Sequence, residues 1–257
     1  MRRLATALAL LLIACSAGPA AAERLVVSLS NHRVAVTSNF VGEELVLFGT
    51  IEPDPAGQLR PPYDLVVTVT GPQQTMRTRR KQRMLGIWVN VDSREFVSVP
   101  SYLAVLSNRP VAEIADQETL RKLQIGLNYF LLPQRIGPDV ADTVTDDPFR
   151  RAFVRLQRQQ GLYRESSTAV TFLTPTVFRT AIAMPAAVPT GTYAIEVELF
   201  SQGKLVARTN SALEVIKAGF EQYVADAARD YGLLYGMATA LMALLIGWFA
   251  SVVFRRD

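Results

Sequence analysis

The feature that most constrains this sequence is an uncharged, apolar run over residues 233–254. A helix of about 22 residues is long enough to cross the ~30 Å hydrocarbon core of a bilayer. A buried helix of a soluble protein is the alternative, but such helices are usually shorter. The run therefore predicts one transmembrane helix at 233–254, with the preceding residues held at a membrane.

The charges on either side of this run predict its orientation. Arg255 and Arg256 follow it directly, whereas Glu221, Asp226 and Asp230 precede it. The cytoplasmic flanks of membrane helices carry an excess of Lys and Arg. We therefore expect a cytoplasmic tail at 255–257, a juxtamembrane helix at 218–232, and the larger domain on the opposite side of the membrane.

Small side chains recur within and just before the run at steps of three or four residues, so they would line one face of a helix. They are Gly232, Gly236, Ala240, Ala243, Gly247 and Ser251. Such a face lets a second membrane helix approach closely, although Gly and Ala are also common in membrane helices generally. The pattern predicts packing against a membrane-protein partner, or self-association.

The N-terminal residues have the pattern of a secretory signal peptide. Arg2 and Arg3 precede an apolar stretch, and three alanines at 20–22 provide a cleavage site. Cys15 offers an alternative, in which a bacterial lipobox is cut and this cysteine is lipidated. A chain with a membrane helix gains little from a lipid anchor, so we favour removal of residues 1–22. Both alternatives export the domain, and we expect a bacterial inner-membrane protein with a periplasmic domain.

Charge and residue content exclude several classes of function. The sequence has 27 basic and 23 acidic residues, and loss of 1–22 removes two arginines, which leaves 25 against 23. Such a nearly neutral domain lacks the basic face of a nucleic-acid-binding protein. Cys15 is the only cysteine and His32, in a predicted turn, the only histidine. Because catalytic and phosphate-binding motifs are also missing, we expect no enzyme, no metal and no cofactor.

Short apolar strands separated by turn residues flank a different middle region. The first region, 23–110, has predicted strands at 26–30, 33–37, 44–51, 64–70, 75–79, 84–90, 95–99 and 102–107. The closing region, 166–217, has them at 169–173, 177–184, 192–201 and 204–215. This pattern predicts a mainly β protein, an immunoglobulin-like antiparallel sandwich that is either one large or two small.

The strand at 192–201 has the clearest alternation. Four apolar side chains are predicted to face inward, namely Tyr193, Ile195, Val197 and Leu199. The intervening side chains, among them Glu196, Glu198 and Phe200, are predicted to face outward. The Gln202-Gly203 turn then predicts a hairpin with the last strand, at the closing edge of the sandwich.

The middle region, 111–165, is predicted to be a helical insertion. One helix is expected at 112–123, although its apolar face is irregular. A second is expected at 149–160, because Asp147 and Pro148 form a helix start and Gly161 a helix end. Capping explains Asp147 without any acid–base role.

A row of basic side chains is the strongest candidate for a binding surface. Arg77, Arg79, Lys81 and Arg83 would project from one face of an extended segment at ~7 Å intervals. We expect Trp88 and Asn90 of a following buried strand, and Tyr163 and Arg164 of a later segment, to lie beside them. The row has three interpretations: a solvated edge strand, a dock for acidic lipid headgroups or a partner's acidic surface, or a site for a small oxyanion.

Several segments resemble a known family over essentially the whole mature chain. They are residues 76–90, 161–165 and 190–208 and the closing residues around the apolar run. They resemble the alphaproteobacterial transmembrane protein family labelled Alph_Pro_TM, which is uncharacterised. The resemblance implies an inner-membrane protein without assigned catalytic residues, from a family whose genes are often neighbours of a sulfite-exporter-type anion transporter.

Two classes of function are compatible with these observations. The favoured one is a single-pass, non-catalytic accessory or binding subunit of a membrane partner such as an anion exporter. The alternative is a stand-alone periplasmic sensor, chaperone or envelope-scaffold module, which would act on proteins instead of ions.

Overall fold

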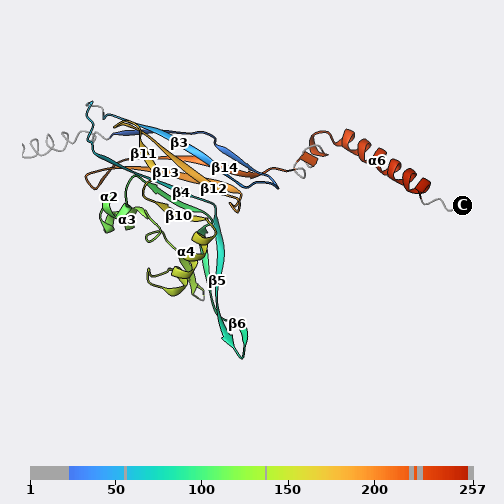
Figure 1. Ribbon diagram of the computed structural model, residues 1–257, viewed down its shortest axis with the longest axis horizontal. Helices are drawn as coiled ribbons and strands as arrows, with labels where there is room; N and C mark the ends of the chain where they lie inside the picture. The colour runs from blue at the N-terminus through green and yellow to red at the C-terminus, as the bar shows by residue number, and fades with distance from the viewer. Residues whose placement is uncertain (1–22, 55–56, 137, 220–222, 225–227, 254–257) are drawn as a thin grey trace, which may run out of the picture.

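The computed structural model describes residues 23–54, 57–136, 138–219, 223–224 and 228–253. The predicted signal peptide with Cys15, the tail at 255–257 and much of the juxtamembrane helix lie outside the described residues. The strands form three sheets, and Figure 1 shows their arrangement.

The first sheet has four strands and is antiparallel throughout. In order across the sheet these are β1 (Arg24–Leu29), β3 (Gly42–Glu52), β12 (Val177–Pro185) and β11 (Val170–Phe172). Its central pair joins residues of the first predicted β region to residues of the closing one.

The second sheet has six strands and is antiparallel except at its two edges. Its order is β10 (Tyr163–Ser166), β7 (Leu103–Ser107), β4 (Tyr63–Thr70), β13 (Gly191–Ser201), β14 (Lys204–Lys217) and β2 (Arg33–Val36). The outer pairs, β10 with β7 and β14 with β2, run parallel. The predicted hairpin of β13 and β14 is confirmed, but β2 lies beyond β14, so β14 is not an edge strand.

One hydrophobic core joins the two sheets, which answers whether there is one sandwich or two. Leu47 and Phe178 of the first sheet pack in the same cluster as Val67 and Leu213 of the second. The four inward residues predicted on β13 are all fully buried, namely Tyr193, Ile195, Val197 and Leu199. The predicted sandwich is therefore confirmed as a single large one.

The strand order is that of an immunoglobulin-type sandwich. The first sheet corresponds to strands A, B, E and D, and β4, β13 and β14 correspond to C, F and G. Tyr193, near the start of β13, donates its hydroxyl hydrogen to the Pro189 carbonyl oxygen at 2.6 Å, as the tyrosine corner of such sandwiches does. This contact anchors the loop that enters β13.

Two short helices cover part of the outer face of the second sheet. They are α2 (Val111–Ile114) and α3 (Gln117–Leu123), and the single helix predicted at 112–123 is wrong, because Ala115 is extended and interrupts it. Val111, Ile114 and Leu120 form a second apolar cluster with Phe200. Glu198 and Phe200 point outward from the core, as predicted, but both are buried on that outer face.

The third sheet contains a long hairpin that projects from the sandwich (Figure 1). It is made of β5 (Gln73–Met84), β6 (Ile87–Pro100), β8 (Pro133–Ile136) and β9 (Asp139–Asp142). The hairpin turns at Leu85 and Gly86, both with positive φ. The separate strand predicted at 84–90 is therefore wrong, because the turn lies within it.

The second predicted helix is confirmed as α4 (Pro148–Gln159). Asp147 caps it by accepting hydrogen bonds from the backbone N–H groups of Phe149 and Arg150. Phe153 of α4 packs against Phe96 of β6, with ring centroids 5.2 Å apart. The helix therefore stands against the base of the hairpin.

The C-terminal apolar run forms α6 (Gly232–Val253), a helix of 22 residues. By length and composition, residues Gly232–Ser251 are suited to cross a membrane, and none of that window is buried against the rest of the described chain. This segment is therefore one candidate membrane-spanning helix, as the sequence predicted.

Candidate binding surfaces of the β domain

At the base of the hairpin, Arg77, the first residue of the predicted basic row, forms an ion pair with Glu95. Arg77 donates a hydrogen bond to a Glu95 carboxylate oxygen at 2.7 Å, and Arg135 lies 3.4 Å from the other oxygen. The hydrogen bond from Arg77 is the main reason why the pKa of Glu95 lies below its usual value. Arg77 is therefore part of a structural charge cluster.

The outer members of the row lie where the sequence predicted them. Lys81 is paired with Asn90 and Arg83 with Trp88, and directly opposed residues share a face of an antiparallel pair. Trp88 is 69% exposed, so the prediction that it lies in a buried strand is wrong. Within the described chain, Arg79, Lys81 and Arg83 form no ion pair; Arg83 donates only a long hydrogen bond to the Gly86 carbonyl oxygen, at 3.4 Å.

The hairpin ends in a cluster of exposed apolar side chains that sequence reasoning missed. These are Met84, Leu85, Ile87 and Trp88, which we call the apolar tip. Leu85 is fully exposed and Ile87 is 66% exposed. Large apolar side chains gathered at one exposed place usually mark a contact with a partner or a membrane.

Tyr163 and Arg164 are not brought to the basic row. Tyr163 is buried in β10 and donates its hydroxyl hydrogen to the Pro100 carbonyl oxygen at 2.7 Å, at the sandwich end of β6. Burial raises the pKa of this phenol. Arg164 is the next residue of β10 and is exposed there. The structure therefore joins the row to Trp88 and Asn90 only.

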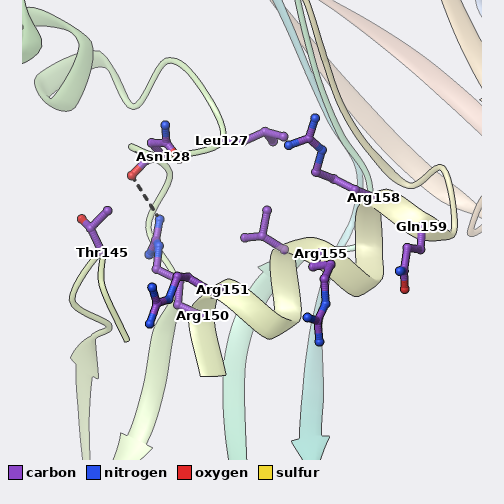
Figure 2. A pocket seen from close by; sticks show the side chains of 9 residues that line it. Leu127, Asn128, Thr145, Arg150, Arg151, Arg155, Arg158 and Gln159 are labelled. Carbon is purple, nitrogen blue, oxygen red and sulfur yellow. Dashed lines mark hydrogen bonds between the residues drawn. The ribbon is translucent and has the colours of Figure 1, made fainter. Parts of the chain in front are cut away.

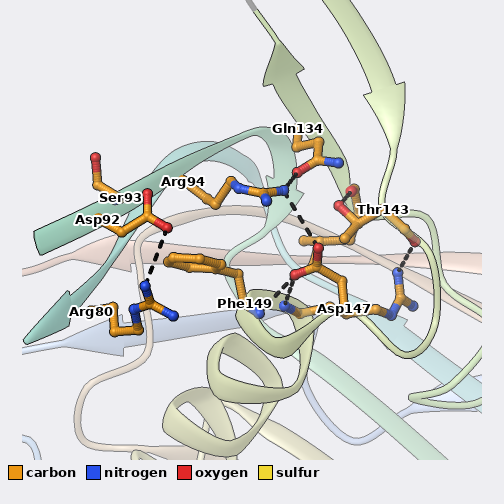
Figure 3. A network of polar contacts seen from close by, with 10 residues as sticks. Arg80, Asp92, Ser93, Arg94, Gln134, Thr143, Asp147 and Phe149 are labelled. Carbon is orange, nitrogen blue, oxygen red and sulfur yellow. Dashed lines mark hydrogen bonds and ion pairs between the residues drawn. The ribbon is translucent and has the colours of Figure 1, made fainter.

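A polar network fixes the hairpin base to α4 (Figure 3). Arg94 of β6 donates to the Gln134 side chain, lies 3.4 Å from an oxygen of Asp147, and stacks 5.1 Å above the Phe149 ring. Two residues further along the same face of the hairpin, Arg80 is 4.0 Å from Asp92. These contacts hold the projecting hairpin in one direction relative to the domain.

A pocket of about 450 Å³ lies along α4 (Figure 2) and is the second candidate site. Its lining consists of Leu127, Asn128, Thr145, Arg150, Arg151, Val154, Arg155, Arg158 and Gln159. Four of these nine residues are arginines, and none is acidic. We call it the arginine pocket.

Arg150 is the buried member of the arginine pocket, with 4% exposure. Its guanidinium donates to the carbonyl oxygens of Phe130 at 2.7 Å and of Thr143 and Asn128 at 3.4 Å. It also lies 4.8 Å from the centroid of the Phe130 ring. Burial lowers the pKa of this guanidinium, and the charge of the Asp142 carboxylate offsets part of that effect.

The sequence contained only part of the signal for this pocket. Arg151, Arg155 and Arg158 recur at steps of four and three, so they were expected on one face of the helix. The loop residues that face them, Asn128 and Thr145, come from segments whose placement depends on tertiary contacts. Arg150 has no sequence signature at all, because its burial is decided by the carbonyl groups around it.

The small residues of the predicted helix-packing face lie on α6 without contacts to the domain. An added Cβ at Gly232, Gly236 or Gly247 would meet nothing within 4 Å in the described chain. Ala240, Ala243 and Ser251 lie on the same helix. This face is therefore open to another helix.

In the described part of the chain, no group of three or more His, Cys, Asp and Glu side chains converges. His32 is exposed in the connection between β1 and β2. Its backbone carbonyl oxygen accepts a hydrogen bond from the N–H group of Glu214.

In the described part of the chain, a β sandwich is followed by one helix suited to cross a membrane, which is the arrangement of a transmembrane protein with one candidate span. The chain matches the family model described as "Putative transmembrane protein (Alph_Pro_TM)" over residues 24–256, and it belongs to that family. No curated protein matches it. Among solved structures, the sporulation control protein Spo0M from Bacillus subtilis is similar at a TM-score of 0.28 and 10% identity, over 82% of this chain and 56% of that one. The chain thus spans little more than half the length of Spo0M.

Proposed function

We propose that this protein is a non-catalytic binding subunit of the inner membrane, whose periplasmic β domain holds an anion in the arginine pocket for a membrane partner such as a sulfite-type anion exporter. The arginine pocket is the observation that carries this proposal. Its cationic lining favours an oxyanion or a carboxylate over a neutral or cationic ligand.

The chemistry of the lining suits an oxyanion. Guanidinium groups are planar, remain charged at any ordinary pH, and bind carboxylates and related oxyanions through paired hydrogen bonds. Arg150 is held in place by three carbonyl oxygens, and its buried charge would be better compensated with an anion in the pocket. A volume of about 450 Å³ is within the usual range for small-molecule sites.

The same lining supports a binding role over a catalytic one. The neutral polar residues Asn128, Thr145 and Gln159 can orient a ligand, but a general base or an activated nucleophile is not among the lining residues. Reversible binding of the intact ligand is the use that fits such a site. The open small-residue face of α6 supports the partner, because it would accept a second membrane helix.

Anion binding is the first prediction. The full chain in detergent should bind sulfite, sulfate or a small dicarboxylate saturably in isothermal calorimetry. The double substitution Arg155→Gln with Arg158→Gln should weaken binding by roughly tenfold or more, because each hydrogen bond to a charged group contributes ~1.5–3 kcal/mol.

The matched control is Arg179→Gln, which removes an exposed arginine on β12, outside the arginine pocket, and should leave the affinity unchanged. Equal binding by the wild type and the double variant, or no saturable binding of any of the three probes, would contradict the proposal.

Copurification from solubilised membranes separates the two classes of function. A transporter supports the accessory role, whereas envelope-assembly proteins would support a scaffold module.

A further inference from the structure

The β5–β6 hairpin leaves the sandwich at the same end as the chain that continues to α6. Thr70, the last residue of β4, pairs with Ala194 near the start of β13, and Val215 near the end of β14 pairs with Gly191. These strand ends therefore meet at one end of the second sheet. β5 begins there at Gln73, and β14 ends there at Lys217.

Pro72 confirms this proximity. An added Cβ at Gly191 would lie 2.9 Å from Cγ of Pro72, which immediately precedes the hairpin. The hairpin and the segment leading to the membrane-crossing helix thus start from neighbouring positions. The hairpin therefore projects from the end of the sandwich at which the chain leaves for the membrane-crossing helix.

The side chains of the hairpin are sorted by polarity along its length. The apolar tip comes first, with Trp88 69% and Leu85 fully exposed. Arg83, Lys81 and Arg79 follow on the face that also carries Trp88, and they form no ion pair within the described chain. Residues 81–91 contain no Asp or Glu. Moving from the turn towards the sandwich, the order is therefore apolar, aromatic and cationic.

We propose that the apolar tip inserts into the interfacial region of an anionic lipid bilayer, with Arg79, Lys81 and Arg83 against the lipid phosphates. This order of side chains matches the order of layers that a bilayer presents. Tryptophan prefers the level of the headgroups, and exposed Lys and Arg are attracted to anionic lipids. The proposal concerns the hairpin alone and is independent of anion binding in the arginine pocket.

The dimensions fit a shallow insertion. Residues 84–88 lie within two residues of the turn at 85–86, which at ~3.3 Å per residue corresponds to a depth of ~7 Å. Interfacial segments bury their apolar side chains ~5–10 Å into the boundary between headgroups and acyl chains. The cationic residues, further up the strand, would then remain level with the phosphates.

A bilayer fits the tip better than a folded protein does. A stable protein interface uses about 20–30 residues on each side, whereas the tip offers four apolar residues on a convex turn. The polar network at Arg94 and Asp147 holds the hairpin in a fixed direction, so a soft surface that adapts to it is a suitable counterpart. The bilayer that holds α6 provides such a surface without a further partner.

The second prediction is a spectroscopic test on the full chain. The sequence has two tryptophans, Trp88 and Trp248, so Trp248→Phe leaves Trp88 as the only one. In vesicles of phosphatidylcholine and phosphatidylglycerol, we expect blue-shifted emission from Trp88, quenching by lipids with brominated acyl chains, and protection from aqueous acrylamide. In detergent-free vesicles of phosphatidylcholine alone, quenching by brominated lipid should be weaker.

Two sets of variants in the Trp248→Phe background separate the apolar from the electrostatic contribution. Leu85→Ser with Ile87→Ser should abolish quenching by brominated lipid. Arg79→Gln, Lys81→Gln and Arg83→Gln together should remove the preference for phosphatidylglycerol, lowering the insertion equilibrium on the order of a hundredfold, since each cation near an anionic surface contributes roughly fivefold. Gln74→Ser, at the exposed base of β5, is the control and should change nothing.

The proposal is wrong if Trp88 stays as accessible to acrylamide in anionic vesicles as in detergent, with no quenching by brominated lipid. It is equally wrong if a photo-crosslinker at position 85, in native membranes, joins a protein and not lipid. Since every substituted side chain is exposed, unchanged far-ultraviolet circular dichroism will show that the variants remain folded. The variants of the apolar tip should lose quenching by brominated lipid but keep anion binding in the arginine pocket.

Discussion

Glu198 lies in the middle of β13 with its carboxylate buried, at 1% exposure. Neither carboxylate oxygen accepts a hydrogen bond within the described chain. Arg208 is opposite it on β14, but its Nη2 binds Glu196 at 2.7 Å, while its Nε is 3.5 Å from the Glu198 oxygen. An ionised carboxylate is costly in such a place, because burial removes its hydration.

Glu198 therefore gives the third prediction, a pH dependence of stability. Burial raises the pKa of this carboxyl from 4.5 to about 7, so the folded state binds more protons than the unfolded state between these two values. Stability should then fall as pH rises through this window. Glu198→Gln, which resembles the protonated form, should be more stable than the wild type, with an advantage that grows by about 2 kcal/mol between about pH 5 and pH 8.

Denaturant unfolding of the full chain in detergent, followed by circular dichroism at both pH values, measures this difference. Glu214→Gln is the matched control, because Glu214 is an exposed carboxylate on β14 paired with Arg33. An advantage of Glu198→Gln that is the same at both pH values would show that the buried carboxyl does not titrate in this window.

For single residues, the sequence predicted the features that depend only on nearby residues in the chain. Asp147 caps α4 because its side chain reaches the N–H groups two and three residues on, a relation contained in the sequence itself. The inward residues of β13 were equally readable, since strand alternation is strict. The burial of Phe200 was not, because the two helices that cover it are brought there by the tertiary fold.

At the element scale, the hairpin shows why a strand boundary can be misplaced. Residues 84–90 are apolar and have the composition of a buried strand, yet the turn at Leu85 and Gly86 interrupts them. Two-residue hairpin turns are usually recognised in a sequence by Asn-Gly or Asp-Gly. Here the first turn residue is Leu85, so the sequence does not indicate a turn. The apolar tip was hidden for the same reason, because composition alone does not distinguish a core strand from an exposed turn.

The fourth prediction concerns the open face of α6. Gly236→Leu or Gly247→Leu should weaken an assembly through this helix by roughly tenfold or more, because an overpacked interface costs ~1–3 kcal/mol. Membrane insertion should be unaffected, since leucine keeps the helix apolar. Native gel electrophoresis of the solubilised complex gives the readout, and Met242→Leu, off this face of α6, is the control. Unchanged migration of both glycine variants would indicate that the small residues are only background composition.

At the scale of the whole molecule, the fold class was predictable, but the pairing of its strands was not. The number and spacing of short strands indicate a sandwich, and the structure confirms one. The sequence left open whether 23–110 and 166–217 form one core, because pairs such as β3 with β12 join residues far apart in the chain. The arginine pocket depends on the same long-range placement.

The orientation of the domain is the fifth prediction, and the proposed function depends on it directly. A periplasmic domain is required if the arginine pocket is to bind, outside the cytoplasm, the anion that an exporter releases. The charges that flank α6 favour this orientation. Alkaline phosphatase folds to an active enzyme only outside the cytoplasm, so fusions to it report the side of the membrane directly.

The most direct measurement is therefore the phosphatase activity of two fusions in intact bacterial cells, one after Asp230 and one after Asp257. We predict an active enzyme for the fusion after Asp230 and an inactive one for the fusion after Asp257. Similar amounts of both fusion proteins on immunoblots provide the control. An inactive fusion after Asp230 together with an active one after Asp257 would place the β domain in the cytoplasm and contradict the proposed function.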